Sequence, residues 1–285
     1  MRTIVIYHRS DFDGIFCREI AKKFLLDCDT IGLEYGDPIP FIPSDDRLYM
    51  LDFSVSNLMN HPNLIWIDHH KTAIEKFGKK PGIQLDGVAA CRLAWQWFSG
   101  SYNEGSPYPN KSDYLDRSIV EPLAVRLAGE YDIWDKRDPN ADLFQHGLRS
   151  QELTPEVWNY LFCKKHGDIM VEALLKQGRA VQYAKTKENE SIALNQTLTL
   201  KWEGFLFIVC NHARFNSHLF TAALQPQHDA CLGFCYDGKQ RRWKVSMYGV
   251  PGKPEVDLSG IALKYGGGGH KQACGFTCAV LPFPL

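Results

Sequence analysis

Short apolar runs, each ending at polar residues, dominate the first quarter of the chain. Runs rich in β-branched and aromatic residues lie at Thr3–Tyr7, Asp29–Tyr35, Arg47–Leu51 and Asn63–Ile67. Runs of this length and composition predict buried strands. Helical spacing of apolar residues predicts helices at Ile15–Leu26, Gly87–Phe98 and Ile119–Gly129. The alternation predicts an α/β fold whose N-terminal, mainly parallel sheet is flanked by helices.

The pattern changes in the second half of the chain. A long, charged helical pattern runs from Trp158 to about Asn195, and strand-like runs follow at Thr197–Trp202, Phe205–Cys210, Ala230–Tyr236 and Arg242–Tyr248. A turn at Asp237-Gly238 suits a hairpin, and Ser217–Leu224 has helical spacing. We therefore expect three parts: an N-terminal domain at 1–157, a helical connector at 158–195, and a smaller α/β domain with a mixed sheet at 196–285.

Candidate chemistry lies where the N-terminal strands end. His8, Asp11 and Asp13 follow the first strand, Asp52 follows the third, and Asp68-His69-His70 follow the fourth. Ligands of open α/β sheets bind at the carboxyl ends of the strands, so these side chains are expected to lie together. Imidazole and carboxylate groups in such a set indicate a metal site, in which Asp68 orients a histidine.

Several of these residues also have ordinary structural interpretations. Asp11-x-Asp13 is common in solvated turns, and Asp52 has the residue type of a helix N-cap. Asp132 and Asp135 are both candidates to complete the acidic set. His146 and Arg149 fall in a region that reads as loop-rich, where structural roles are equally suitable.

Composition restricts the function. A net charge of -1 at pH 7 argues against a broad surface that grips phosphates, so a nucleic acid substrate would be short or held at one end. The N-terminus enters a strand directly and no apolar stretch approaches membrane-spanning length, from which we expect a cytoplasmic protein with no membrane partner. Nine scattered cysteines do not suggest a disulfide framework.

A glycine run stands near the C-terminus. Gly266–Gly269 precedes His270 and Lys271, and successive glycines allow backbone N–H groups to converge on an anion. A flexible loop is the alternative; the two basic residues favour a phosphate or carboxylate site. Cys231-x-x-x-Cys235 and Cys274-x-x-x-Cys278 have zinc-like residue types, but this spacing in strands is more typical of small core residues.

Taken together, the motifs resemble the DHH phosphoesterase superfamily joined to its DHH-associated C-terminal domain. The resemblance covers both domains and rests on residues that occur in the family's order. They are His8-x-x-Asp11-x-Asp13-Gly14, Asp52, Asp68-His69-His70, Asp132 and Gly267-Gly268-Gly269-His270.

The resemblance implies a two-metal site, most often of Mn²⁺, with Mg²⁺ as the other candidate. His8, Asp11 and Asp52 would hold one ion; Asp13, Asp52, His69 and Asp132 would hold the other, with Asp52 bridging. His70 would face the substrate phosphate and Asp68 would support it. Gly267, Gly268, Gly269 and His270 would bind substrate across an interdomain cleft. A bridging water would then attack phosphorus in line.

The expected function is hydrolysis of short nucleotide phosphodiesters to nucleoside monophosphates. The substrates would be oligoribonucleotides, short single-stranded ends or dinucleotides, cleaved in an oligoribonuclease-like or exonucleolytic (3'-5' or 5'-3') manner. The alternatives are a pyrophosphate or polyphosphate hydrolase and a catalytically silent nucleotide-binding regulator. By analogy with relatives, a homodimer is also an expectation.

Overall fold

A computed structural model describes residues 1–100, 110–135, 137–163, 165–213 and 217–284. The chain divides into two compact units, Met1–Val181 and Gln182–Leu285. The helix α8 (Gly167–Gln196) begins in the first unit and ends in the second.

The first unit is built on a parallel sheet of five strands in the order β2-β1-β3-β4-β5. The strands are β1 (Thr3–His8), β2 (Asp29–Leu33), β3 (Arg47–Leu51), β4 (Leu64–Asp68) and β5 (Gly82–Gln84). The register pairs Val5 with Thr30 on one side and with Tyr49 on the other. The strand order reverses at β1, which makes the boundary between β1 and β3 the topological switch point of the sheet.

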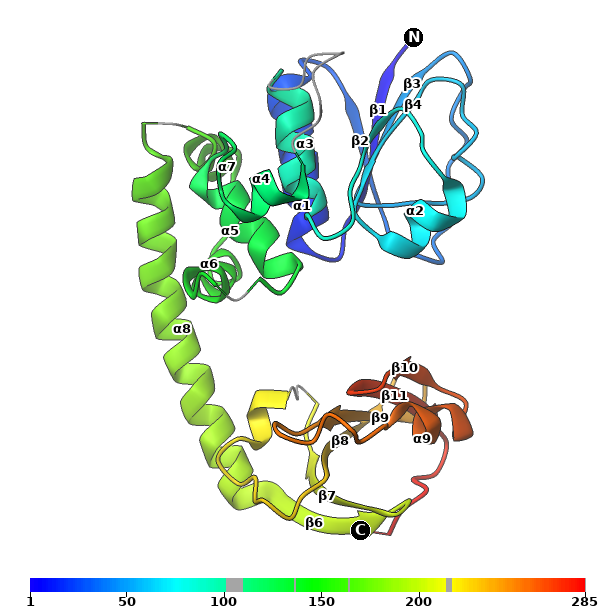
Figure 1. Cartoon of the computed structure of the whole chain (residues 1–285), viewed down its shortest axis with the longest axis vertical. Coiled ribbons are helices and arrows are strands. Elements are labelled where there is room, and N and C mark those ends of the chain that lie inside the picture. Colours follow the sequence, from blue (N-terminus) through cyan, green and yellow to red (C-terminus); the bar gives the residue numbers. More distant parts are fainter. Residues whose placement is uncertain (101–109, 136, 164, 214–216, 285) are drawn as a thin grey trace. The chain divides into compact units, whose positions relative to one another are not determined.

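Alternate residues of each strand enter two separate cores. Val5, Tyr49 and Ile67 pack with the helices α1 (Phe12–Phe24) and α3 (Ala90–Phe98). Ile4, Met50 and Trp66 belong to the other core, which the short helix α2 (Lys71–Phe77) covers. Figure 1 shows α1 and α3 on one face of the sheet and α2 on the other. Both faces of the central strands are therefore buried, which explains the continuous apolar and aromatic runs Ile4–Tyr7, Leu48–Leu51 and Leu64–Ile67.

Four further helices lie on the side of α1 and α3 that faces away from the sheet (Figure 1). They are α4 (Lys111–Leu115), α5 (Leu123–Asp132), α6 (Asn140–Leu148) and α7 (Pro155–Leu161). The loop-rich interpretation of Phe144–Arg149 is wrong. Ala141, Phe144 and Leu148 are at most 1% exposed, so α6 presents an apolar face to the core.

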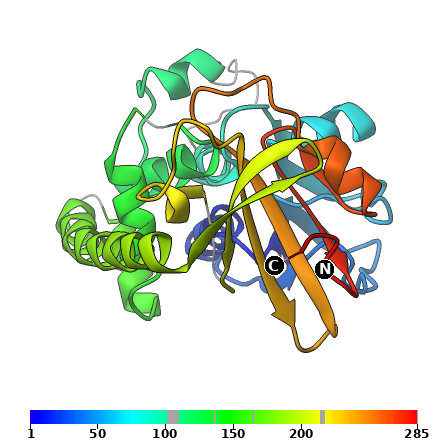
Figure 2. The same cartoon turned by 90° about the horizontal axis from the view of Figure 1, so that it is seen from below.

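The second unit is a mixed six-stranded sheet in the order β10-β11-β9-β8-β7-β6. Its strands are β6 (Thr197–Trp202), β7 (Phe205–Asn211), β8 (Ala230–Asp237), β9 (Arg242–Gly249), β10 (Gly268–His270) and β11 (Ala273–Cys278). Its helical elements are η1 (Ser217–Phe220) and α9 (Ser259–Lys264). β7 and β8 are parallel and the other pairs antiparallel. Figure 2 shows β8 and β9 side by side as a hairpin.

The prediction of a parallel N-terminal sheet with helices and a mixed C-terminal sheet is confirmed. Differences lie mainly in the lengths of elements. The helix predicted at Ile119–Gly129 is α5, which begins after Pro122, because proline suits a helix start, and ends at Asp132. The pattern from Trp158 onward comprises two helices, α7 and α8, and the helical turn at Ser217 is a short 3-10 segment. β10 was not expected as a strand.

Candidate metal centre

The candidate ligands meet at the carboxyl edge of the N-terminal sheet. His8 ends β1, Asp52 follows β3, and His69 follows β4. β1 and β3 flank the switch point, where the loops that follow the two strands diverge and leave room for a ligand. Asp11 and Asp13 reach the same edge from the start of α1, and Asp132 reaches it from the end of α5.

One group consists of His8, Asp11 and Asp52, whose ligand atoms all lie within 4.8 Å of one another. His8 Nδ1 is 2.9 Å from Asp11 Oδ2 and 3.6 Å from Asp52 Oδ2. The other ring nitrogen of His8 contacts Ser10 Oγ at 2.7 Å, which fixes the ring with Nδ1 toward the carboxylates. The group is a candidate site for one cation.

A second group consists of Asp13, His69 and Asp132. His69 Nε2 lies 3.6 Å from Asp13 Oδ2 and 3.3 Å from Asp132 Oδ2. The two oxygens of Asp13 accept hydrogen bonds from the backbone N–H groups of Ala90 and Cys91, both at 2.8 Å, at the start of α3. These bonds hold a buried carboxylate in a fixed orientation toward His69.

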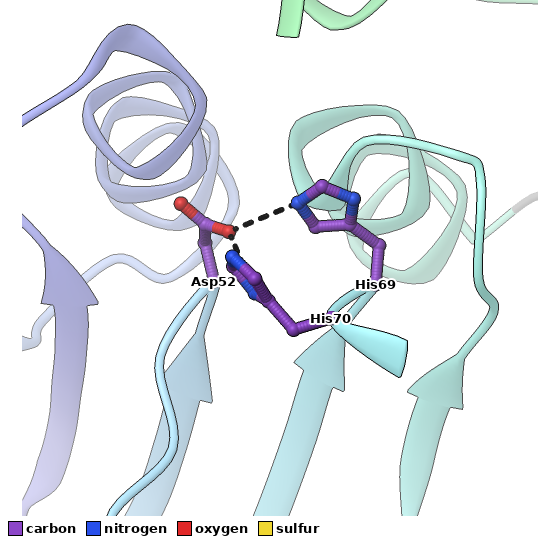
Figure 3. A group of neighbouring side chains, drawn as sticks. All are labelled: Asp52, His69 and His70. Atoms are coloured by element: carbon purple, nitrogen blue, oxygen red, sulfur yellow. Dashed lines mark ion pairs between the residues drawn. The ribbon is translucent and has the colours of Figure 1, made fainter. Parts of the chain in front are cut away.

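The Asp52 side chain joins the two groups. Its Oδ2 lies 3.6 Å from His8 Nδ1. Its Oδ1 lies 3.4 Å from His69 Nε2 and 3.8 Å from His70 Nδ1 (Figure 3). The Asp52 backbone adopts a φ of 53°, in the left-handed region, which costs a non-glycine residue roughly 1 kcal/mol or more. The strained backbone and the two oxygens that face different imidazoles suit a carboxylate that bridges two ions.

Asp68 is fully buried and holds His70 in place. Asp68 Oδ1 accepts hydrogen bonds from the backbone N–H groups of His69 and His70, at 2.7 and 2.9 Å, and contacts His70 Nδ1 at 2.7 Å. Its Oδ2 accepts a bond from Trp66 Nε1 at 3.1 Å. Asp68 thus makes Nδ1 the donor and leaves His70 Nε2 for other partners; this ring is 40% exposed.

Gly14 explains why the acidic loop and the first strand can approach so closely. A Cβ atom at this position would lie 1.9 Å from the carbonyl oxygen of His8. Any side chain here would push the first turn of α1 away from the end of β1. Glycine at this point of the motif is therefore required to keep Asp11 and Asp13 beside His8.

The pKa values of the clustered histidines and carboxylates depend strongly on one another. Its carboxylate neighbours Asp11 and Asp52 raise the pKa of His8 to about 10. Burial lowers the pKa of His69, but Asp52, Asp13 and Asp132 outweigh it and raise that pKa to about 10. Burial, together with the charges of Asp52 and Asp132, raises the pKa of Asp13 well above its ordinary value. The cluster thus favours the protonated forms of His8, His69 and Asp13.

The residues fit divalent cations. His8 Nδ1 and Asp52 Oδ1 are buried and form no hydrogen bond with the described residues, although charged atoms lie close to both. Buried polar atoms without hydrogen bonds are uncommon, and a cation would satisfy both. A mixed set of imidazole and carboxylate ligands suits Mn²⁺ or Mg²⁺.

Other sequence candidates lie elsewhere. Asp135 pairs with Arg137 at 2.6 Å, so Asp132 and not Asp135 joins the cluster. Arg149 is exposed and stacks against the rings of Phe12 and Tyr131. His146 is a partly buried residue of α6.

The glycine-histidine segment belongs to the second unit. Gly268, Gly269 and His270 form the exposed edge strand β10, in which Gly269 pairs with Cys274 of β11, and Gly267 precedes that strand. Gly266 and Gly269 have φ values of 77° and 129°, so the backbone uses the freedom that glycine provides.

Sequence reasoning missed three supports of the site. Ser10 orients His8, Trp66 Nε1 anchors Asp68, and the N–H groups of Ala90 and Cys91 anchor Asp13. Only Ser10 had a signal in the sequence, because it stands between His8 and Asp11. The other two connect strands and helices that come together only in the folded chain.

Comparisons with known proteins give similarities in sequence and in structure. No family model matches the sequence. The uncharacterized protein R106 of Acanthamoeba polyphaga mimivirus is 24% identical over 310 residues, which cover 96% of this chain and 67% of that protein.

Among solved structures, the pGpG-specific phosphodiesterase PggH of Vibrio cholerae superposes with a TM-score of 0.51 at 16% identity. The match covers 98% of this chain and 94% of PggH. RecJ of Thermus thermophilus in complex with Mn²⁺ gives a TM-score of 0.43 at 15% identity, over 96% of this chain and 49% of RecJ.

The architecture and the order of the motifs define the class of fold. The parallel sheet, the helical region and the mixed sheet match the fold of PggH, which supports the DHH-type fold that the resemblance implied. Within the described residues, none of the helices combines the length and apolar character needed to cross a bilayer.

Proposed function

We propose that this protein is a metal-dependent phosphodiesterase that hydrolyses short nucleotide substrates to nucleoside monophosphates. The observation that supports the proposal most directly is the Asp52 carboxylate, whose two oxygens face His8 and His69 from one buried position. A carboxylate shared between two ligand groups is the arrangement that a two-metal site requires. The net charge of -1 suits a short substrate better than a long duplex.

The proposed ligands are His8, Asp11 and Asp52 for one ion and Asp13, Asp52, His69 and Asp132 for the other. Two divalent cations, with Mn²⁺ preferred over Mg²⁺, would supply an activated water and Lewis-acid stabilisation of the phosphoryl oxygens.

His70 has a separate proposed role. Its Nδ1–H donates to Asp68, and this contact raises the pKa of His70 and favours the protonated ring. In the protonated ring Nε2 is also a donor and can serve a substrate phosphate oxygen. Asp68 acts through His70 as a positioning residue and does not itself touch substrate. The ring exposure of His70, larger than that of His69, agrees with this assignment.

The roles of the other parts of the chain follow as proposals. Residues 1–157 carry catalysis, 158–195 connect, and 196–285 select the substrate through Gly267, Gly268, Gly269 and His270. A pyrophosphate or polyphosphate hydrolase and a silent nucleotide-binding regulator are the competing functions. The regulator is disfavoured because each expected ligand type is present in one cluster.

The proposal is tested by a product time course. End-labelled di- to decanucleotides of RNA and DNA are incubated with the protein and Mn²⁺, in parallel with pyrophosphate and polyphosphate. Monophosphate products from the short oligonucleotides support the proposal. Phosphate release from polyphosphate alone would assign the competing hydrolase, and no turnover of any substrate would assign the regulator.

Two variants test the role of Asp52. Asp52→Ala should abolish turnover and reduce bound metal, because both ligand groups lose an oxygen at once. Asp46→Ala is a matched control: Asp46 is also buried, precedes the same strand β3, and pairs with Arg2 at 3.0 Å away from the ligand cluster. Near-normal turnover and metal content in Asp52→Ala would contradict the two-metal site.

Two more variants separate the adjacent histidines. His69→Ala should lower the metal content measured by elemental analysis. His70→Ala should keep the metal and lose at least about tenfold in kcat, as expected for a group that acts on the substrate. Equal loss of metal in both variants would contradict the separate roles.

A further inference from the structure

An exposed aromatic side chain stands beside the first ligand group. Tyr35 follows β2 and is 60% exposed, and its ring centroid lies 5.9 Å from that of His8. The ring packs on buried Phe53, the residue after Asp52, with centroids 4.9 Å apart and planes inclined by 34°. Tyr35 thus rests on a rigid support at the edge of the candidate metal centre.

The turn that carries Tyr35 is firmly held. Asp37 donates its N–H to the carbonyl of Glu34 at 3.1 Å, and the Asp37 side chain accepts the N–H of Glu34 at 2.9 Å. Gly36 supplies the positive φ, 102°, that the turn needs.

Arg9, the residue after His8, ties this turn to the end of β1. It contacts the carboxylates of Glu34 at 3.2 Å and Asp37 at 3.1 Å. The position of Tyr35 relative to His8 is therefore fixed before any ligand binds. Preorganised aromatic rings lose little conformational entropy when a ligand stacks on them.

We infer that Tyr35 is a stacking platform for the nucleobase next to the reacting phosphate, in a base subsite beside His8 and Phe53. The ring packs on Phe53, and Tyr35 as a whole is 60% exposed, so part of its surface is accessible to a base. Every nucleobase has a π-face, so such a platform accepts different bases and tolerates different sequences. The inference rests on the proposed function and deepens it. It requires a substrate that contains a base, whereas pyrophosphate and polyphosphate contain none.

The competing explanation is that Tyr35 only covers Phe53. It predicts a loss of stability on substitution with no dependence on the base of the ligand. Both explanations allow a loss of stability when Tyr35 is replaced. Only the stacking platform predicts a loss of affinity that depends on whether the ligand contains a base.

The experiment compares two ligands that differ only in the base. Binding of AMP and of ribose 5-phosphate is measured by titration calorimetry in the presence of Mn²⁺. The proteins are the wild type, Tyr35→Ala, Tyr35→Leu and Tyr35→Phe. The leucine variant keeps an apolar contact with Phe53 but has no ring, so it repeats the test if the alanine variant is unstable. Tyr160→Ala is the matched control, because Tyr160 is 50% exposed and also lies beside a histidine ring, that of His166.

The wild type should bind AMP more tightly than ribose 5-phosphate. Loss of the ring at Tyr35 should weaken AMP binding by about fivefold or more, the lower end of the effect of base stacking, and leave ribose 5-phosphate within about twofold. Tyr35→Phe and Tyr160→Ala should preserve the preference for AMP. Equal weakening of both ligands, or no weakening of either, would overturn the inference.

The binding comparison is independent of turnover. If the protein hydrolyses no phosphodiester, the proposed function fails, while a Tyr35-dependent preference for AMP would still establish the base subsite. If dinucleotides are cleaved but Tyr35→Ala binds AMP as the wild type does, the proposed function stands and the base subsite is refuted.

Discussion

Replacement of Asp68 by asparagine tests how the site is held together. The substitution preserves the size of a fully buried side chain and removes its charge. Asp68 Oδ1 receives the N–H groups of His69 and His70 and the Nδ1 of His70. The asparagine oxygen can keep these contacts only if its NH₂ group points at Trp66 Nε1, which is itself a donor.

The cost follows from the number of these contacts. A hydrogen bond to a charged group contributes about 1.5–3 kcal/mol, against about 0.5–1.5 kcal/mol for a neutral one. The loss is thus about 1 kcal/mol for each contact on Oδ1, or about 3 kcal/mol for the set. Trp66 Nε1 retains its second acceptor, the carbonyl of Phe53 at 3.1 Å. The buried NH₂ group that faces this donor gains no acceptor from it, which adds about 1–3 kcal/mol to the cost.

Urea unfolding in the presence of EDTA measures this cost without a contribution from bound metal. The midpoint should fall while the m-value stays unchanged, because the unfolded surface is the same. With Mn²⁺, turnover should also fall by about tenfold or more, since His70 loses its anchor. Asp86→Asn, at an exposed position, should change stability by less than about 0.5 kcal/mol. A change this small in Asp68→Asn, with normal turnover, would refute the role assigned to Asp68.

Two further predictions concern the fourth acidic position and the second unit. Asp132→Asn should reduce bound metal and turnover, whereas Asp135→Asn should leave both within about twofold, because the Asp135 carboxylate pairs with Arg137; elemental analysis and rate measurements of the two variants decide the point. His270→Ala should retain its metals and hydrolyse a small aryl phosphodiester normally, but lose at least about tenfold on a dinucleotide. Equal losses of His270→Ala on the two substrates would place His270 in the chemical step.

The sequence predicted the N-terminal sheet because its strands are buried on both faces. Runs such as Ile4–Tyr7 consist of apolar and aromatic residues, and each is followed by a polar residue, so strand ends could be recognised without a structure. The periodicity of apolar residues and the polar residues that end each run are local properties of the sequence. Helix α6 and the strand β10 were missed for the opposite reason: the loop-like and glycine-rich residues in them acquire regular structure through packing and strand pairing.

The identity of the candidate ligands was also available from sequence, since His8, Asp52 and His69 each follow a recognisable strand. The choice between Asp132 and Asp135 was not, because it depends on how far α5 extends and on the partner that Arg137 provides.

Only the tertiary structure showed how the ligand atoms face one another. The Asp52 oxygens are directed to different imidazoles, and Asp68 holds His70 through contacts that Trp66 completes. Tyr35 lies beside His8 because β1 and β2 are neighbours in the sheet. Residue types and periodicity can be read directly from the sequence, whereas the direction of a side chain depends on backbone angles and on neighbours distant in sequence. The sequence therefore determined which groups are available for chemistry, and the fold determined which of them meet.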